Sequence, residues 1–219
     1  MLTFSDIQSN EEINTYIRQA DESLKAMGFT EHAFAHSNRC AGYASEWLLA
    51  LGYSEKEARL ARIAGYMHDI GNVVNRYDHA QSGAVLAFGI LSRLEMPPDE
   101  LAAVVTAIGN HDEATAHPVN SVAAALILAD KTDVRRTRVR NAEISSFDIH
   151  DRVNYAVREC GVTLDIKTRS LTLELDVDTE ICQVLDYFEI FMGRMLLCRR
   201  AADFLGLRFR LVINGSALM

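Results

Sequence analysis

Four histidines and two aspartates are the residues of this sequence best suited to act together in chemistry. In chain order they are His36, His68, Asp69, His79, His111 and Asp130. Each can offer a nitrogen or an oxygen atom to a metal ion, and burying such groups unpaired in an apolar core would be costly. Small and apolar residues flank His68-Asp69, which favours a desolvated site. The pattern therefore predicts a metal site.

The elements that must position these residues are helices. Helical spacing of apolar residues follows two predicted capping boxes, Ser9–Glu12 and Ser54–Glu57. Helices are expected over about residues 13–27, 35–51, 55–67, 78–94, 99–109 and from 121 into an arginine-rich stretch. Since nothing before residue 160 alternates with strand period, residues 1–160 are expected to form an all-helical domain.

Residues 161–219 follow a different pattern. Residues 162–166 and 171–177 alternate apolar and polar side chains, which predicts a β-hairpin. A long amphipathic helix is expected over 179–205 and a last strand over 207–213. The apolar side of this helix is predicted to be Ile181, Val184, Leu185, Phe188, Met192, Met195 and Leu196. The segment is therefore expected to be a small β-β-α-β unit whose helix covers the apolar face of its sheet.

Four short motifs carry a resemblance to a known family. In chain order, these motifs resemble the successive motifs of the HD superfamily of metal-dependent phosphohydrolases. They are His36–Arg39, Ala64–Gly71, Asn110-His111 and Ala129–Lys131. The resemblance covers about residues 30–140. It implies a mainly α fold, an HD-domain helical bundle, to which the small C-terminal α+β unit is appended.

The resemblance also implies how the ligands are divided. His79 and His111 make the chain similar to the two-metal branch, which includes HD-GYP cyclic-dinucleotide phosphodiesterases and HD-type dinucleotide tetraphosphate hydrolases. One ion would be bound by His36, His68, Asp69 and Asp130. A second ion would be bound by His79 and His111, with Asp69 as the catalytic bridge. A single-metal site that does not use the last two histidines remains an alternative.

The donor types fit this division. Imidazole and carboxylate ligands with open positions suit octahedral iron or manganese better than closed structural zinc. Two ions about 3.5–4 Å apart can hold a bridging hydroxide and clamp phosphoryl oxygens. We therefore expect two divalent transition-metal ions, and hydrolysis of a phosphate ester or anhydride of a nucleotide or other small phosphorylated molecule.

A basic stretch follows the last ligand. If the helix continued beyond Asp130, Lys131, Arg135 and Arg138 would share one face, while Arg136 and Arg140 would share another. These cations suit phosphate recognition, although a solvated helix face is the alternative. The position of Arg136 resembles that of an arginine in the dinucleotide tetraphosphate hydrolases. The residues predicted to bind substrate are Lys131, Arg135, Arg136 and Asn72.

The chain departs from the two-metal pattern in two places. Asn72 stands where these hydrolases often have a phosphate-binding lysine, and the Gly-Tyr-Pro signature is absent. Both departures weaken the case for cyclic-dinucleotide cleavage. Two other functions remain open. HD-type di-iron oxygenases share this six-ligand set, and a non-catalytic ligand-binding module would need no turnover.

The remaining histidines are expected to play no part in the metal site. His32 precedes the first motif by four residues, and His117 stands before a proline in a loop. His150-Asp151 is expected to be a surface dipeptide at the start of a helix over 151–159.

Bulk composition limits the partners. The net charge of −8 disfavours non-specific binding to nucleic acid or to an anionic membrane. No stretch resembles a signal peptide or a transmembrane helix. Four scattered cysteines without a CxxC pair are typical of a reducing compartment. We expect a cytoplasmic protein, with a homodimer as a further possibility.

Overall fold

A computed structural model describes residues 2–140, 147 and 149–219. The side chain of His150 also lies outside the described part. The helices are α1 (Phe4–Gln8), α2 (Glu11–Ala26), α3 (Phe34–Ala50), α4 (Glu55–Met67), α5 (His79–Arg93), α6 (Pro98–Gly109), α7 (Ser121–Lys131), α8 (Ile149–Ala156) and α9 (Val184–Phe204), with short 3-10 turns η1 (Ile70–Val73) and η2 (Arg136–Arg138). The strands are β1 (Val157–Asp165), β2 (Ser170–Val177), β3 (Arg208–Ile213) and β4 (Ser216–Ala217).

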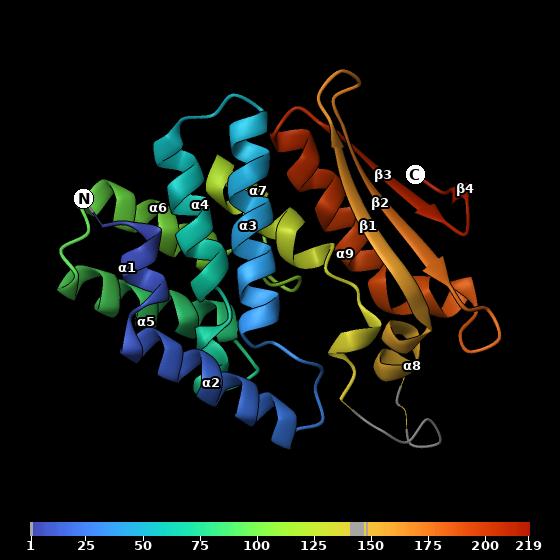
Figure 1. The fold of residues 1–219 in the computed structure, drawn as a ribbon, viewed down its shortest axis with the longest axis horizontal. Coiled ribbons are helices and arrows are strands. Elements are labelled where there is room, and N and C mark those ends of the chain that lie inside the picture. Colours follow the sequence, from blue (N-terminus) through green and yellow to red (C-terminus); the bar gives the residue numbers. More distant parts are fainter. Residues whose placement is uncertain (1, 141–146, 148) are drawn as a thin grey trace.

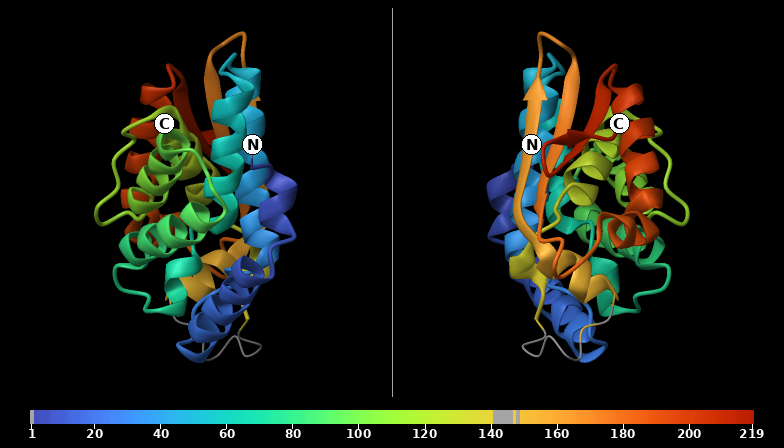
Figure 2. Two further views of the ribbon diagram at one scale, coloured as in Figure 1. Left: turned by 90° about the vertical axis from the view of Figure 1, so that its left-hand side faces the viewer. Right: turned by 90° about the vertical axis from the view of Figure 1, so that its right-hand side faces the viewer.

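The predicted mainly helical fold with a small C-terminal sheet is confirmed. Figure 1 shows the helices α1 to α7 on one side and the sheet on the other, with α9 between them. α9 packs against α7 on one side and against β3 on the other. Buried apolar side chains of the helices and of the sheet form one continuous core. The right-hand view in Figure 2 looks from the side of the sheet, with the helical bundle behind it.

The sheet has the order β1-β2-β3-β4. β1 and β2 form the predicted antiparallel hairpin, and β3 returns parallel to β2 after the crossover through α9. Leu171, Leu173 and Leu175 of β2 are buried, whereas Glu174 and Asp176 between and beyond them are exposed. The alternation read from the sequence thus gives the correct buried face of this strand.

One of the two predicted capping boxes is present. The Ser54 hydroxyl accepts from the Glu57 amide at 3.2 Å, and the Glu57 carboxylate accepts from the Ser54 amide at 3.1 Å. The box predicted at Ser9 is wrong, because Asn10 caps α2 and accepts from the Ile13 amide at 3.1 Å. The Ser9 hydroxyl instead donates to a carbonyl of α1, a helix that the sequence did not predict.

The buried face of α9 differs from the prediction. Leu185 and Met192 were expected inside, but their exposed fractions are 74% and 45%. Tyr187, Phe191 and Cys198 are buried instead. Apolar residues occur almost all around this helix, so spacing alone did not define the face that would pack between α7 and the sheet.

The predicted helix through the arginine stretch is also wrong. α7 ends at Lys131, where the Thr132 hydroxyl donates to the carbonyl of Leu128 at 2.7 Å. Lys131, Arg135 and Arg138 therefore do not share one helix face. β1 starts at Val157, inside the segment expected to be helical. The domain boundary at residue 160 remains a prediction.

Within the described parts of the chain, no helix combines the length and the apolar character needed to cross a membrane.

A close contact between α3 and α4 predicts a stability effect. A Cβ atom at Gly65 of α4 would lie 2.8 Å from the backbone of Ala41 in α3. Gly65→Ala should therefore force the two helices apart and lower the free energy of unfolding by about 1–3 kcal/mol, as overpacking does. Chemical denaturation followed by circular dichroism measures this loss.

Gly42→Ala is the matched control in α3. A Cβ there would meet only the end of the Glu46 side chain, at 3.8 Å. It should leave stability unchanged or raise it by about 0.5–1 kcal/mol through helix propensity. Equal effects of the two substitutions would show that the α3–α4 contact does not limit the packing.

Candidate metal centre

The six predicted ligands lie at or near helix ends, and all six are buried. They are His36 in the first turn of α3, His68 and Asp69 directly after α4, His79 at the start of α5, His111 just after α6 and Asp130 in the last turn of α7. Side chains from five separate segments therefore meet in the interior of the helical bundle.

The turn between α4 and α5 depends on a glycine. A Cβ at Gly71 would lie 1.9 Å from the carbonyl oxygen of His79 and 2.5 Å from the amide nitrogen of Gly83. Only glycine lets the two segments come this close. Asp78 adopts a left-handed conformation with φ of 56°, which reverses the chain immediately before His79. Both features bring His79 back toward His68 and Asp69.

One set of donor atoms converges from His36, His68, Asp69 and Asp130. The Nε2 atoms of His36 and His68 are 3.2 Å apart. The Asp69 Oδ2 atom lies 3.6 Å from His36 Nε2 and 3.1 Å from His68 Nε2. Asp130 Oδ1 lies 3.3 Å from His36 Nε2 and 3.8 Å from His68 Nε2. Two nitrogens and two oxygens thus face one point.

A second set faces the other oxygen of Asp69. The Nε2 atoms of His79 and His111 are 3.2 Å apart. They lie 3.5 Å and 3.9 Å from Asp69 Oδ1. Because the two carboxylate oxygens face different donor sets, Asp69 stands between them, as the predicted bridging role requires.

All four histidines are anchored through Nδ1. In His68, His79 and His111 this atom lies 2.6–3.1 Å from the carbonyl oxygen of the residue three positions earlier. In His36 it lies 2.8 Å from Oδ2 of Asp133. A carbonyl oxygen can only accept, so Nδ1 must carry the proton and the Nε2 lone pair faces the cluster.

This arrangement fits a cation between each pair of rings. Two Nε2 lone pairs at 3.2 Å repel each other unless positive charge lies between them. Two nitrogens about 2.1 Å from a shared ion, at roughly 90–110° to each other, would be about 3.0–3.4 Å apart. Asp69 Oδ2 is buried without a hydrogen-bond partner among the described residues. Both observations fit metal ligands.

The electrostatics of the cluster favour positive charge at its centre. Burial alone would raise the pKa of Asp69, but positive charge at His68 Nε2, supplied by a proton at the place that a metal ion would take, holds it well below its usual range. Burial raises the pKa of Asp130 too, but Lys131, His36 and His68 together hold it well below its usual range. Burial lowers the pKa of His111 to about 3, so this ring is neutral and able to act as a ligand.

Cys40 lies near the first donor set but suits it poorly. Its Sγ atom is 3.7 Å from both ring nitrogens of His36, so it contacts the side of the ring. Burial raises the pKa of the thiol well above its usual range, which keeps it protonated and a weak ligand. The imidazole and carboxylate donors therefore account for the cluster better.

The four predicted substrate-binding residues are divided between two places. Asn72 donates to the carbonyl and to Oδ1 of Asp69 at 2.9 and 3.0 Å, so it orients this carboxylate. The ammonium group of Lys131 lies 2.7 Å from Asp130 and borders the histidine cluster. Arg135 and Arg136 line a separate surface pocket with Arg39 and Cys160, away from the histidines.

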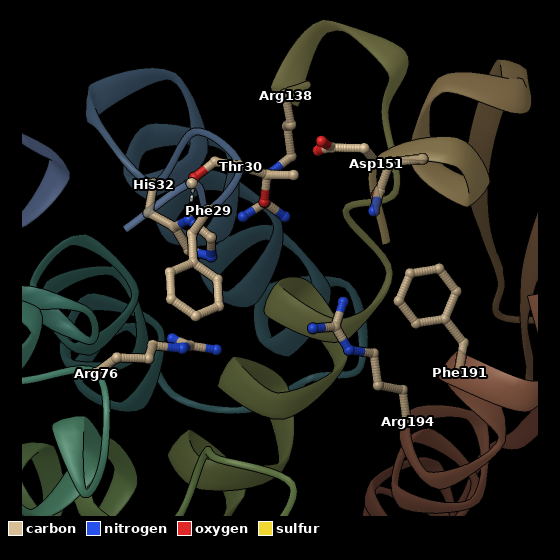
Figure 3. A pocket seen from close by; sticks show the side chains of 10 residues that line it. Phe29, Thr30, His32, Arg76, Arg138, Asp151, Phe191 and Arg194 are labelled. Atoms are coloured by element: carbon tan, nitrogen blue, oxygen red, sulfur yellow. Dashed lines mark hydrogen bonds between the residues drawn. The ribbon is translucent and has the colours of Figure 1, made fainter. Parts of the chain in front are cut away.

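Other cations occupy the place expected for Arg135 and Arg136. The pocket around Asp69, His79, His111 and Asp130 is also lined by His32, Arg76, Arg138 and Arg194. Figure 3 shows the three guanidinium groups, which come from different elements, pointing into the neighbouring cleft that they also line. Arg76 Nη1 lies 3.4 Å from His79 Nε2, consistent with a lone pair on this nitrogen.

Sequence reasoning missed several of these residues. Asp133 stands three positions after Asp130 at the end of α7, a spacing that could have suggested a role beside the ligands. Arg194 is the only charged residue between Glu189 and Arg199, a weak but readable signal. Asp151, expected at the surface, is 8% exposed and lines the neighbouring cleft. Nothing in the sequence singled out Arg76.

Comparison with known proteins places this constellation in a family. Residues 33–142, half of the chain, match the HD domain family. The relative named Uncharacterized protein MJ1020, from Methanocaldococcus jannaschii, is 24% identical over 172 residues, which cover 68% of this chain and 66% of that protein. The chain therefore spans slightly less than two thirds of this relative. The crystal structure of a predicted HD superfamily hydrolase from an uncultured Thermotogales bacterium is 27% identical, with a TM-score of 0.45, over 57% of this chain and 67% of that one.

Metal content should follow the two donor sets. His68→Ala and Asp69→Ala should remove most bound transition metal, because Asp69 faces both sets and His68 lies against it. His79→Ala or His111→Ala should each remove about one ion and keep the other. Elemental analysis of protein purified without chelators measures both outcomes.

His117→Ala is the control, because this histidine is exposed in a loop. It should retain the full metal content. If His79→Ala and His111→Ala retained it as well, the second donor set would hold no ion.

Asp133 should control metal affinity without being a ligand. Asp133→Asn weakens the acceptor of His36 Nδ1–H and should lower affinity by about 10–100-fold, as loss of an outer hydrogen-bond partner does. Competition with a chelator of known affinity measures this change. Asp178→Asn, which breaks a surface pair with Arg158, should leave the affinity unchanged.

Proposed function

The chain belongs to the HD domain family, and from this premise we propose that it is a two-metal phosphohydrolase of small phosphorylated molecules. The ions would be held by His36, His68, Asp69 and Asp130 in one set and by His79, His111 and Asp69 in the other. Iron and manganese are the metals that this mixture of donors favours.

One observation carries the proposal. The donor cluster lies at the bottom of a pocket whose wall carries the guanidinium groups of Arg76, Arg138 and Arg194. Guanidinium groups bind phosphate oxygens through paired hydrogen bonds and a fixed positive charge. A metal site that opens onto such a wall suits a phosphorylated substrate better than a neutral one.

The reaction would be a hydrolysis without any redox change. Water adds to phosphorus and the bond from phosphorus to the leaving oxygen breaks, giving inorganic phosphate and an alcohol or a shorter phosphate. When bound, two ions supply Lewis acidity that activates water and neutralises the phosphoryl oxygens.

The side chains of the chain position this chemistry. Asn72 holds the carboxylate of Asp69 through its amide group, so both Asp69 oxygens keep their directions. Lys131 lies between Asp130 and Glu113, at 2.7 and 3.1 Å, and maintains Asp130 as a carboxylate. His32 donates from Nδ1 to the carbonyl of Thr30 at 2.7 Å, which leaves Nε2 as an acceptor in the pocket.

A phosphatase screen tests the proposal. Protein loaded with iron or manganese should release inorganic phosphate from at least one member of a panel of nucleotides and small phosphate esters. Asp69→Asn should lower kcat by about two orders of magnitude or more, because both donor sets depend on this carboxylate. His117→Ala should keep the rate of the unaltered protein.

The two rival functions give different results in the same samples. Oxygen consumption coupled to substrate oxidation, with no phosphate release, would identify a di-iron oxygenase. Tight binding of a phosphorylated compound without turnover in fully metal-loaded protein would identify a non-catalytic module. Either result would overturn the proposal.

A further inference from the structure

Three arginines from distant parts of the chain meet beside the candidate metal centre. Arg76 lies in the turn before α5, Arg138 ends η2 and Arg194 lies in the middle of α9. Residues 33–142 match the HD domain, so Arg194 is contributed from outside that region. The pocket is therefore completed by the C-terminal unit.

Two of the three arginines, Arg138 and Arg194, are held by other residues, which fixes the direction of their guanidinium groups. Arg138 donates from Nε to the carbonyl of Glu31 and from Nη1 to the carbonyl of Asp133, both at 2.9 Å. Arg194 donates from Nε to Glu113 and lies 4.8 Å from the ring of Phe191. A group already held in place loses little conformational entropy when it binds an anion.

These groups carry more positive charge than their partners neutralise. Arg76 forms no ion pair with a carboxylate of the described residues; its Nη1 lies 3.4 Å from the amide oxygen of Asn72. Arg138 donates to two carbonyls and lies 3.8 Å from Asp133, which also pairs with Arg135. Arg194 shares Glu113 with Lys131. The excess favours an anion among the three groups.

The arginines stand between two cavities. They line the inner pocket together with the ligands Asp69, His79, His111 and Asp130. They also line an outer cleft with about 610 Å³ of space, open solvent included. Phe29, Asp151, Asn154 and Phe191 border this outer cleft, and Figure 3 shows the guanidinium groups pointing into it.

We propose that Arg76, Arg138 and Arg194 form a second phosphate subsite, beside the one at the metal centre. The preferred substrate would then carry at least two phosphate groups, as a phosphoanhydride or a bisphosphate. This inference rests on the proposed function for the identity of the inner subsite. It assigns the C-terminal unit a specificity role through Arg194.

The positions of the metal centre and of the three arginines favour a substrate with two phosphate groups over one with a single phosphate group. Two divalent ions with Asp69 and Asp130 leave a net charge that one phosphate dianion can balance. The three guanidinium groups line both the inner pocket and the outer cleft, where the aromatic and polar residues lie. A phosphate chain can therefore run outward past the arginines, with the organic part in the outer cleft.

Binding of two inorganic probes tests the subsite without relying on turnover. Imidodiphosphate, a non-hydrolysable analogue of pyrophosphate, should reach both subsites, whereas inorganic phosphate should occupy the metal subsite alone. Calorimetry on metal-loaded protein should show imidodiphosphate binding at least about tenfold more tightly than phosphate. Metal content is measured after each titration to verify that the probe has not removed the ions.

Substitutions assign this difference to the arginines. Arg138→Gln and Arg194→Lys should each weaken imidodiphosphate binding by about tenfold or more and phosphate binding by less than about threefold. Arg194→Lys keeps the charge and the pair with Glu113 but loses the planar fork. Arg158→Gln, an exposed arginine on β1, is the control for loss of one charge and should change neither affinity.

Two results would overturn the inference. An equal loss for both probes would mean that the arginines and the metals bind the same phosphate. No loss for either probe, in variants with unchanged melting temperature, would mean that the three arginines bind no anion. In protein stripped of metal, imidodiphosphate should still bind more weakly to the variants than to the unaltered protein. The subsite can therefore stand even if no phosphatase activity is found, and the activity can stand without the subsite.

Discussion

The structure depends on how it holds four imidazole nitrogens and two carboxylates that all present lone pairs to one another. Left alone in an apolar core, these acceptors would repel. Hydrogen bonds at Nδ1, the ring nitrogen that faces away from the cluster, fix the orientation of the four histidines. Three of them donate to the carbonyl of the residue three positions earlier, and His36 donates to Asp133. The helix ends and the tight turn at Gly71 place these restraints, so local backbone geometry determines where each donor atom points.

Charge is arranged in layers around this centre. Two cations lie next to the cluster, Lys131 beside Asp130 and Arg76 beside His79, and two further acids hold cations in place around it. Asp133 accepts a hydrogen bond from His36 and forms ion pairs with Arg39 and Arg135. Glu113 forms ion pairs with both Lys131 and Arg194. Each acid therefore links the cluster to a different element of the fold. The outer layer explains how an acidic protein can present a cationic wall beside the candidate metal centre.

Much of the fold could be predicted from the sequence, because helices and strands leave local signals. The six residues that meet at the centre were predicted from their types and from motifs that resemble those of the HD superfamily. Helical spacing and the box at Ser54 identified the bundle, and alternation in β2 identified the sheet face. The face of α9 could not be predicted, since its apolar residues surround the helix and only the partners decide. Arg135 and Arg136 follow Asp130 closely in the sequence, but α7 ends at Lys131 and the chain beyond it carries both arginines to a separate surface pocket. The arginines that do face the centre come from 76, 138 and 194, a proximity that only tertiary structure creates.

The bond between His36 and Asp133 joins residues 97 positions apart in the chain. An ion held jointly by His36 and Asp130 would act across the same span as a removable cross-link. Closing a loop of roughly 100 residues restricts the unfolded chain by an amount worth about 4–5 kcal/mol in the simplest polymer estimate. A metal ion at this centre would thus also stabilise the fold, and the free energy of unfolding would increase with the concentration of that metal.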